Sequence, residues 1–165
     1  AERDKFLPAG SLTAHHIDSH DTFWWPSWGK KWRREQFDIT KVKLLTLIFG
    51  SLPGPFMMFS GGEIGIEQLL PKLASVKRSK IWLTGEITWW TSSNYPDGLF
   101  AISRKIDKKV SASLVNFTDK ELVIKNDENY QLKSVLLQIG ELITIDPSAI
   151  KLPPFTGAVV EVEIG

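Results

Sequence analysis

The sequence predicts an α/β segment followed by an all-β segment. Up to about residue 95, apolar residues follow a mixed pattern that includes helical spacing, and beyond it they form short strand-like runs between turn residues. The elements expected in the first segment come in the order strand, helix, strand, helix, which is half of an α/β pattern. The second segment is typical of an antiparallel sandwich or barrel.

The first segment contains two predicted strands, each followed by a predicted helix. Residues 13–18 are predicted as a strand and 39–49 as a helix, because Asp38 is a suitable N-cap and apolar side chains follow at helical spacing. A cluster of glycine and proline ends this helix. The unbroken apolar run 56–59 predicts a buried strand of a parallel sheet, and 68–78 a second helix. Two such strands cannot close a sheet, so their apolar faces need neighbours.

The second segment contains a series of predicted strands separated by turn-forming residues. The C-terminal strand alternates apolar and charged residues, as a strand with one wet face does. The predicted strands span residues 99–102, 110–116, 121–124, 134–139, 142–145 and 158–164.

Composition restricts the partners and the chemistry of this chain. Its 165 residues are 42% hydrophobic and carry a formal net charge of +1, so no long-range field favours nucleic acid or acidic lipid. The longest apolar run, 44–49, is too short to span a bilayer. The absence of cysteine excludes disulfides, thiolate catalysis and cysteine zinc sites. We therefore expect neither a nucleic-acid nor a membrane partner, no cofactor, and a cytoplasmic location.

Three interpretations are open for the polar cluster 15–21, which holds all three histidines of the chain. As a metal site, His16, Asp18 and His20 would face the same side of a strand and converge on a cation. As a carboxylate site, Asp21 would lie at the C-terminal end of a buried strand, where α/β folds keep catalytic groups, with His20 beside it. In a purely structural interpretation, His20 and Asp21 cap a loop and bind each other.

Four segments, in the same order along the chain, resemble motifs of the α-amylase family of glycoside hydrolases and glucanotransferases. Residues 17–21 (Ile-Asp-Ser-His-Asp) resemble the motif at the end of the family's seventh barrel strand. Residues 53–65 resemble its eighth-strand motif, with phenylalanine at two of the seven fixed positions. Residues 76–85 are similar to the stretch after its eighth barrel helix, and 113–117 to a strand of its C-terminal all-β domain.

This resemblance implies that the chain is the C-terminal portion of such an enzyme, acting on an α-glucan or maltooligosaccharide. Residues 1–92 would be the last two βα units of a (β/α)8 barrel, and residues 93–165 an antiparallel β-sandwich. Asp21 would be catalytic, as the family's third acidic residue, and His20 would bind the same sugar. The family's nucleophile and acid/base lie on earlier strands. We therefore expect this chain alone to be inactive, and its open apolar faces to drive self-association.

The loop that follows Asp21 is rich in tryptophan. Indole faces stack on the apolar faces of sugar rings, so Trp24 and Trp25 are candidates for substrate binding, although packing inside a barrel would use the same residues. Basic residues among these aromatics would also suit single-stranded nucleic acid, an alternative that the net charge disfavours. The main alternative function is a non-catalytic carbohydrate-binding or interaction module in which His20 and Asp21 are structural. A metal-dependent hydrolase is a third.

Overall fold

The computed structural model describes residues 6, 8, 11–21, 31–90 and 95–165. The helices are α2 (Arg33–Gln36), α3 (Ile39–Ser51), α4 (Leu69–Arg78) and α5 (Lys80–Thr84). The strands are β1 (Glu86–Trp89), β2 (Leu99–Ile106), β3 (Lys109–Asn116), β4 (Leu122–Lys125), β5 (Tyr130–Ile139), β6 (Thr144–Ile145), β7 (Ala149–Leu152) and β8 (Thr156–Ile164). Within these described ranges, no helix has both the length and the apolar character needed to cross a bilayer.

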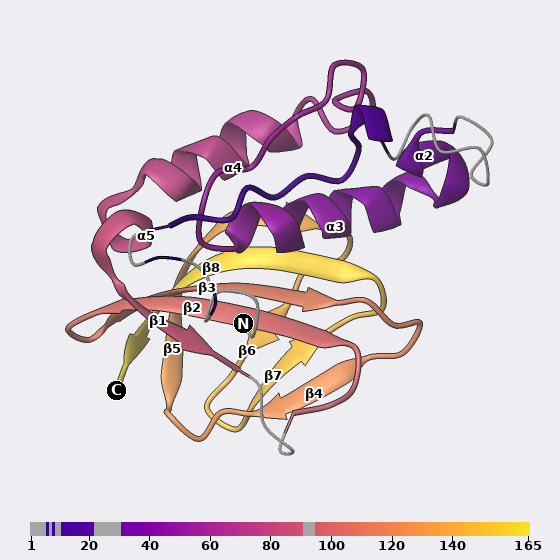
Figure 1. The fold of residues 1–165 in the computed structure, drawn as a ribbon. Coiled ribbons are helices and arrows are strands. Elements are labelled where there is room, and N and C mark those ends of the chain that lie inside the picture. Colours follow the sequence, from indigo (N-terminus) through magenta and orange to yellow (C-terminus); the bar gives the residue numbers. More distant parts are fainter. Residues whose placement is uncertain (1–5, 7, 9–10, 22–30, 91–94) are drawn as a thin grey trace.

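The strands form two antiparallel sheets that lie against each other (Figure 1). The larger sheet has the order β1-β2-β3-β8-β5, and the smaller one has the order β4-β7-β6. Helices α3 and α4 cover the face of the larger sheet that the smaller sheet leaves free (Figure 1). The antiparallel strands predicted beyond residue 98 are therefore confirmed. The sequence does not predict β1 or β7, and β1 joins the larger sheet ahead of the division expected between residues 92 and 93.

Helix α3 begins where the sequence predicts and ends slightly later. The carboxylate of Asp38, its N-cap, accepts a hydrogen bond from the backbone N–H of Lys41 at 3.0 Å. The helix runs through Gly50 to Ser51 and stops at Leu52, where the backbone becomes extended. Helix α4 coincides with the second predicted helix to within one residue at its start.

One parallel β-bridge joins the two segments that are predicted as parallel strands. His15 donates its N–H to a carbonyl of the second segment at 2.9 Å and accepts a hydrogen bond from the N–H of Met57 at 2.7 Å. Helix α3 connects the two segments, so together they form a minimal βαβ unit. The buried strand expected over 56–59 is wrong in extent. Only Phe56 is bridged, and the side chains of Met57 and Met58 are 50% and 37% exposed. The strand expected over 13–18 is wrong in extent too, because only His15 is bridged there.

Two apolar clusters, one on each face of the larger sheet, make up the core. On the helix side, Leu44 and Leu47 of α3 pack with Val115 and Val159 of the sheet, and all four side chains are fully buried. On the opposite side, residues of β3 and β8 pack against β4 and β7. Because both clusters use β3 and β8, the helices and the smaller sheet are supported by the same central strands.

Helix α3 approaches the larger sheet closely at Gly157 of β8. A Cβ atom at this position would lie 2.9 Å from the Cδ2 atoms of both Leu44 and Leu47. Near the end of the helix, the hydroxyl of Ser51 donates to the carbonyl of Leu47 at 2.7 Å and is hydrogen-bonded to the hydroxyl of Ser113 on β3 at 2.8 Å. Small residues on both sides therefore allow the helix to lie directly on the strands.

The fully buried amide of Asn116, at the end of β3, joins the two sheets. Its nitrogen lies within hydrogen-bond distance of the carbonyl oxygens of Lys120 (2.7 Å), Leu152 at the end of β7 (3.0 Å) and Pro153 (2.9 Å). Its oxygen accepts hydrogen bonds from the N–H and the hydroxyl of Thr118, at 2.9 and 2.7 Å. The backbone groups that it satisfies lie in irregular chain, where no strand partner is available.

The close contact at Gly157 predicts the effect of adding a methyl group there. We expect Gly157→Ala to lower the free energy of unfolding by about 1–3 kcal/mol, because the methyl group overpacks the space under α3. Leu47→Ala removes one of the two leucine methyl groups that the added methyl group would contact. The double variant should therefore be more stable than the sum of the two single changes predicts. Urea unfolding of the four proteins measures this coupling, and strictly additive changes would contradict the contact.

Candidate functional site

The first bridged segment leads into a buried carboxyl group, that of Asp18. This residue is 7% exposed, and its Oδ1 accepts a hydrogen bond from the backbone N–H of Arg33 at 3.0 Å. Burial raises the pKa of Asp18 above its usual value. The hydrogen bond from Arg33 and the positive charges of Arg33, Arg34 and His16 oppose that rise. The fold therefore keeps one acidic group out of water at this end of the segment.

The loop that follows Phe59 packs against α2 and against Trp32, the residue before this helix. Arg34 donates from Nη1 to the carbonyl of Gly61 at 2.7 Å, and the N–H of Gly61 donates to the carboxylate of Glu63 at 2.7 Å. Gly61 has a φ of 92°, and a Cβ there would lie 2.9 Å from the indole of Trp32. Trp32 also packs on Phe59, with ring centroids 5.5 Å apart. Trp32 therefore serves packing rather than an open sugar platform.

His20 and Asp21, the predicted sugar-binding and catalytic residues, lie at the surface. His20 Nε2 is 3.2 Å from Asp21 Oδ1, and the two side chains are 76% and 81% exposed. The structure thus brings the two groups together and leaves both accessible. Trp24 and Trp25, the other predicted substrate-binding residues, lie outside the described residues.

The metal interpretation of the polar cluster is not supported by the geometry. Among the residues that the structure describes, no three His, Asp or Glu side chains gather closely enough to hold a metal ion. His16, Asp18 and His20 do not form such a group, because Asp18 is turned inward while His20 is exposed and paired with Asp21. The Nδ1 atom of His16 is buried, with no hydrogen-bond partner among the described residues.

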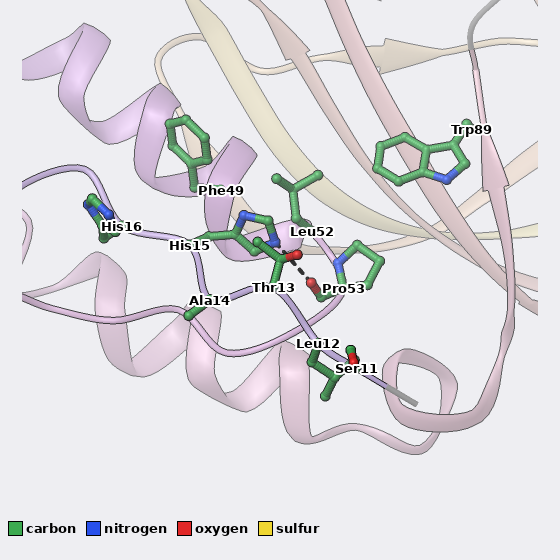
Figure 2. Close-up of a pocket in the computed structure, with 10 residues that line it drawn as sticks. All are labelled: Ser11, Leu12, Thr13, Ala14, His15, His16, Phe49, Leu52, Pro53 and Trp89. Carbon is green, nitrogen blue, oxygen red and sulfur yellow. Dashed lines mark hydrogen bonds between the residues drawn. The ribbon is translucent and has the colours of Figure 1, made fainter. Parts of the chain in front are cut away.

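A pocket of about 430 Å³ lies beside the start of the first bridged segment (Figure 2). Within it, the His15 ring stacks on Phe49 with centroids 6.4 Å apart, and His15 Nε2 lies 2.9 Å from the carbonyl oxygen of Pro53. The remaining lining is mainly backbone and apolar side chains, with the indole of Trp89 on the far side (Figure 2). Of the predicted site residues that the structure describes, neither His20 nor Asp21 lines this pocket.

The sequence predicts Asp18 only as a candidate metal ligand, and no motif in it predicts that this carboxyl group is buried. Its alternation with His16 along a strand is the one signal that places both side chains on the same face. Its hydrogen-bond partner, the N–H of Arg33, comes from 15 positions further along, beyond the aromatic loop. No local pattern indicates such a partner.

The buried acid predicts a change in the pH dependence of stability. The folded pKa of Asp18 lies above its unfolded value, so this group stabilises the fold below the unfolded pKa and the contribution is lost as the pH rises through the folded pKa. Asp18→Asn stays neutral and still accepts the bond from Arg33. The variant should therefore gain stability relative to wild type across that window and level off above it. Urea unfolding at a series of pH values tests this.

Asp97→Asn serves as the control, because Asp97 is exposed and its replacement removes a carboxyl group that is not buried. A difference between Asp18→Asn and wild type that stays constant at every pH would contradict the assignment of a buried, proton-binding carboxyl group.

The chain is similar in fold to solved structures but not in sequence to known families. No protein-family model and no curated protein sequence matches the chain. Among solved structures, an Anoxybacillus α-amylase matches with a TM-score of 0.67 and 17% sequence identity, over 92% of this chain and 38% of its own. Trehalulose synthase MutB from Pseudomonas mesoacidophila matches with a TM-score of 0.50 and 15% identity, over 63% of this chain and 19% of its own. A MutB variant in complex with its substrate sucrose gives the same values.

The chain spans about two fifths of the length of the Anoxybacillus protein and about one fifth of MutB. At these identities the likeness concerns the fold. It covers nearly the whole chain in the case of the α-amylase, including both the helical layer and the sheets. The chain therefore has the fold of part of an α-amylase, and the resemblance to the α-amylase family that its motifs indicate is confirmed at the level of structure.

Proposed function

We propose that this chain is the C-terminal part of an α-amylase-family glycosidase or transglycosidase that acts on α-glucans. The observation that carries the proposal is the parallel bridge between His15 and Phe56, with α3 connecting the two segments and His20 and Asp21 on the carboxyl side of the first. Catalytic groups of β/α barrels lie at that end of the strands. The match to an α-amylase over 92% of the chain supports the same assignment.

In this proposal residues 1–92 contain the end of a (β/α)8 barrel and residues 93–165 form its β-sandwich partner, to whose larger sheet the first part contributes β1. The two sheets and the apolar cluster between them support the second half of this division. The parallel bridge between His15 and Phe56 supports the first half, because neighbouring strands of a β/α barrel are parallel and are connected by a helix.

Asp21 and His20 are the sugar-binding groups of the proposed site. A carboxylate accepts hydrogen bonds from sugar hydroxyls, and an imidazole can accept or donate one. Hydrogen bonds to ring hydroxyls that strengthen in an oxocarbenium-like transition state contribute several kcal/mol to glycosidase catalysis. The exposure of both side chains is compatible with this role, since a sugar must reach them.

The proposed enzyme needs two further acids, a nucleophile and an acid/base about 5 Å apart. In the α-amylase family these belong to barrel strands that precede the segment at His15. We therefore propose that the chain by itself hydrolyses no glucan, and that residues outside it complete the site.

The roles of the two exposed residues predict the response of sugar binding to substitution. We expect the chain to bind maltoheptaose weakly and to release no reducing sugar from it. Asp21→Asn and His20→Ala should each weaken binding roughly tenfold, which corresponds to about one charged hydrogen bond. The exposed Asp97→Asn variant is the matched control and should bind as the unmodified chain does. Saturation-transfer NMR measures the affinities.

Two results would count against this site. If binding survives Asp21→Asn but is lost in Trp24→Ala or Trp25→Ala, the chain is a non-catalytic carbohydrate-binding module. If the chain alone hydrolyses maltoheptaose, the nucleophile and the acid/base lie within it and the proposed division of the site is wrong.

We also propose that the chain self-associates through the face around the parallel bridge. Met57 and Met58 are both substantially exposed there, beside a segment that is paired by one bridge among the described residues, and exposed apolar side chains of this kind favour pairing with another copy. Sedimentation equilibrium should show reversible dimers that Met57→Glu weakens by tenfold or more. Leu142→Glu changes an even more exposed apolar side chain, in the loop between β5 and β6, and should leave association unchanged. A monomer at all concentrations would contradict the proposal.

A further inference from the structure

Arg104 of β2 is a largely buried cation, 9% exposed, that has no acidic partner in the described part of the chain. Its buried Nε–H has no hydrogen-bond partner among the described residues. No described carboxylate lies within salt-bridge distance of its guanidinium. Buried arginines are normally paired, because removing a charge from water without compensation is strongly unfavourable.

The surroundings of Arg104 are set by the turn from α5 into β1. The guanidinium carbon lies 5.8 Å from the ring centroid of Trp82 in α5, within the range of a cation–π contact. A Cβ at Gly85 would lie 3.1 Å from the Cβ of Arg104, so the chain crosses directly over this side chain. The indole N–H of Trp82 donates to the hydroxyl of Ser111 at 2.8 Å. The ring therefore supplies a face but no acceptor for the five N–H donors.

The strand register leaves no acid of the sheet next to Arg104. Arg104 pairs with Ile87 of β1 and Ser111 of β3, and Ser111 in turn pairs with Glu161 of β8. Glu161 therefore lies two strands away, at about 10 Å by normal strand spacing. Its carboxylate is occupied by a hydrogen bond from Ser134 at 2.9 Å.

A second cation adds to the positive potential. Lys77 of α4 places its ammonium 2.7 Å from the carbonyl oxygen of Gly50 and 3.0 Å from those of Leu52 and Gly54. These three bonds use all of its donors, so Lys77 contributes charge but no free N–H. Burial, followed by the nearby charge of Arg104, lowers the pKa of Lys77. Burial alone lowers the pKa of Arg104, with no neighbouring acid to oppose it.

We propose that the junction of α5 with β2 is an anion-binding site in which the guanidinium of Arg104 holds a small oxyanion, such as phosphate or a carboxylate. A planar guanidinium presents two parallel N–H donors, and this geometry matches two oxygens of one oxyanion. Lys77 strengthens the attraction without competing for the ligand's hydrogen bonds. The site lies between the helical layer and the larger sheet, so an occupied site binds only the folded chain and stabilises it.

This inference is independent of the proposed glycosidase role, because none of its residues belongs to the sugar-binding group. The test compares the unmodified chain with Arg104→Met, which keeps much of the side-chain volume and removes the charge. Lys105→Met, on the neighbouring exposed position of β2, is the matched control. Each protein is titrated with sodium phosphate, and in a second arm with sodium acetate, at constant ionic strength made up with sodium chloride.

We expect a saturable rise in Tm for the unmodified chain and for Lys105→Met, and no saturable rise for Arg104→Met. Without added oxyanion, Arg104→Met should be at least as stable as the unmodified chain, because a buried unpaired charge has been removed. The phosphate and acetate arms show which oxyanion the site prefers. An equal rise in Tm for Arg104→Met would show a general salt effect and overturn the proposal.

A second measurement does not depend on the stability of that variant. The Nε–H resonance of Arg104, assigned by its loss in Arg104→Lys, should shift progressively as phosphate is added to the unmodified chain. A resonance that stays in place while phosphate reaches saturating concentrations would equally overturn the site.

Discussion

The packing of helix α3 on the larger sheet is the constraint on which the rest of the structure depends. Leu44 and Leu47 fill the space above Gly157, and a side chain at that position would lift the helix from the strands. Among the residues that the structure describes, the two segments that α3 connects are paired by one bridge, between His15 and Phe56, and one bridge cannot hold them in place. The packing of α3 on the larger sheet therefore fixes the position of both segments, and with it the positions of Asp18 and Asp21.

Much of the fold could be predicted from local patterns. Asp38 and the helical spacing behind it define α3, and the alternation near the C-terminus defines β8. Patterns fail where pairing is decided at long range. β7 is short, follows a turn closed by Asp146 and is specified mainly by its partners β4 and β6. β1 is only four residues long and is exposed along its length, so the alternation of Ile87 and Trp89 with polar residues is too short to predict a strand. The run 56–59 looks buried in sequence, yet the structure leaves Met57 and Met58 exposed.

The candidate site divides in the same way. The motif at residues 17–21 identifies the acidic groups but cannot say which one the fold buries. The structure makes Asp18 the enclosed acid, through the N–H of Arg33, and leaves Asp21 in water beside His20. The catalytic role predicted for Asp21 and the sugar-binding role predicted for His20 remain predictions. Both roles rest on the resemblance of residues 17–21 to a family motif. Arg104 carries no motif at all, and only the register of β1, β2 and β3 reveals that it lacks an acid.

The buried amide of Asn116 has a consequence for which changes this sequence can tolerate. Aspartate has nearly the same shape as asparagine, but it would aim a second oxygen at the carbonyls of Lys120, Leu152 and Pro153 in place of a nitrogen that donates to them. Exchange of one atom thus replaces a two-donor group that serves three carbonyl oxygens with an acceptor that repels all three in the core. This position therefore tolerates no acidic replacement, since that change would break the link between the ends of β3 and β7 and so between the two sheets.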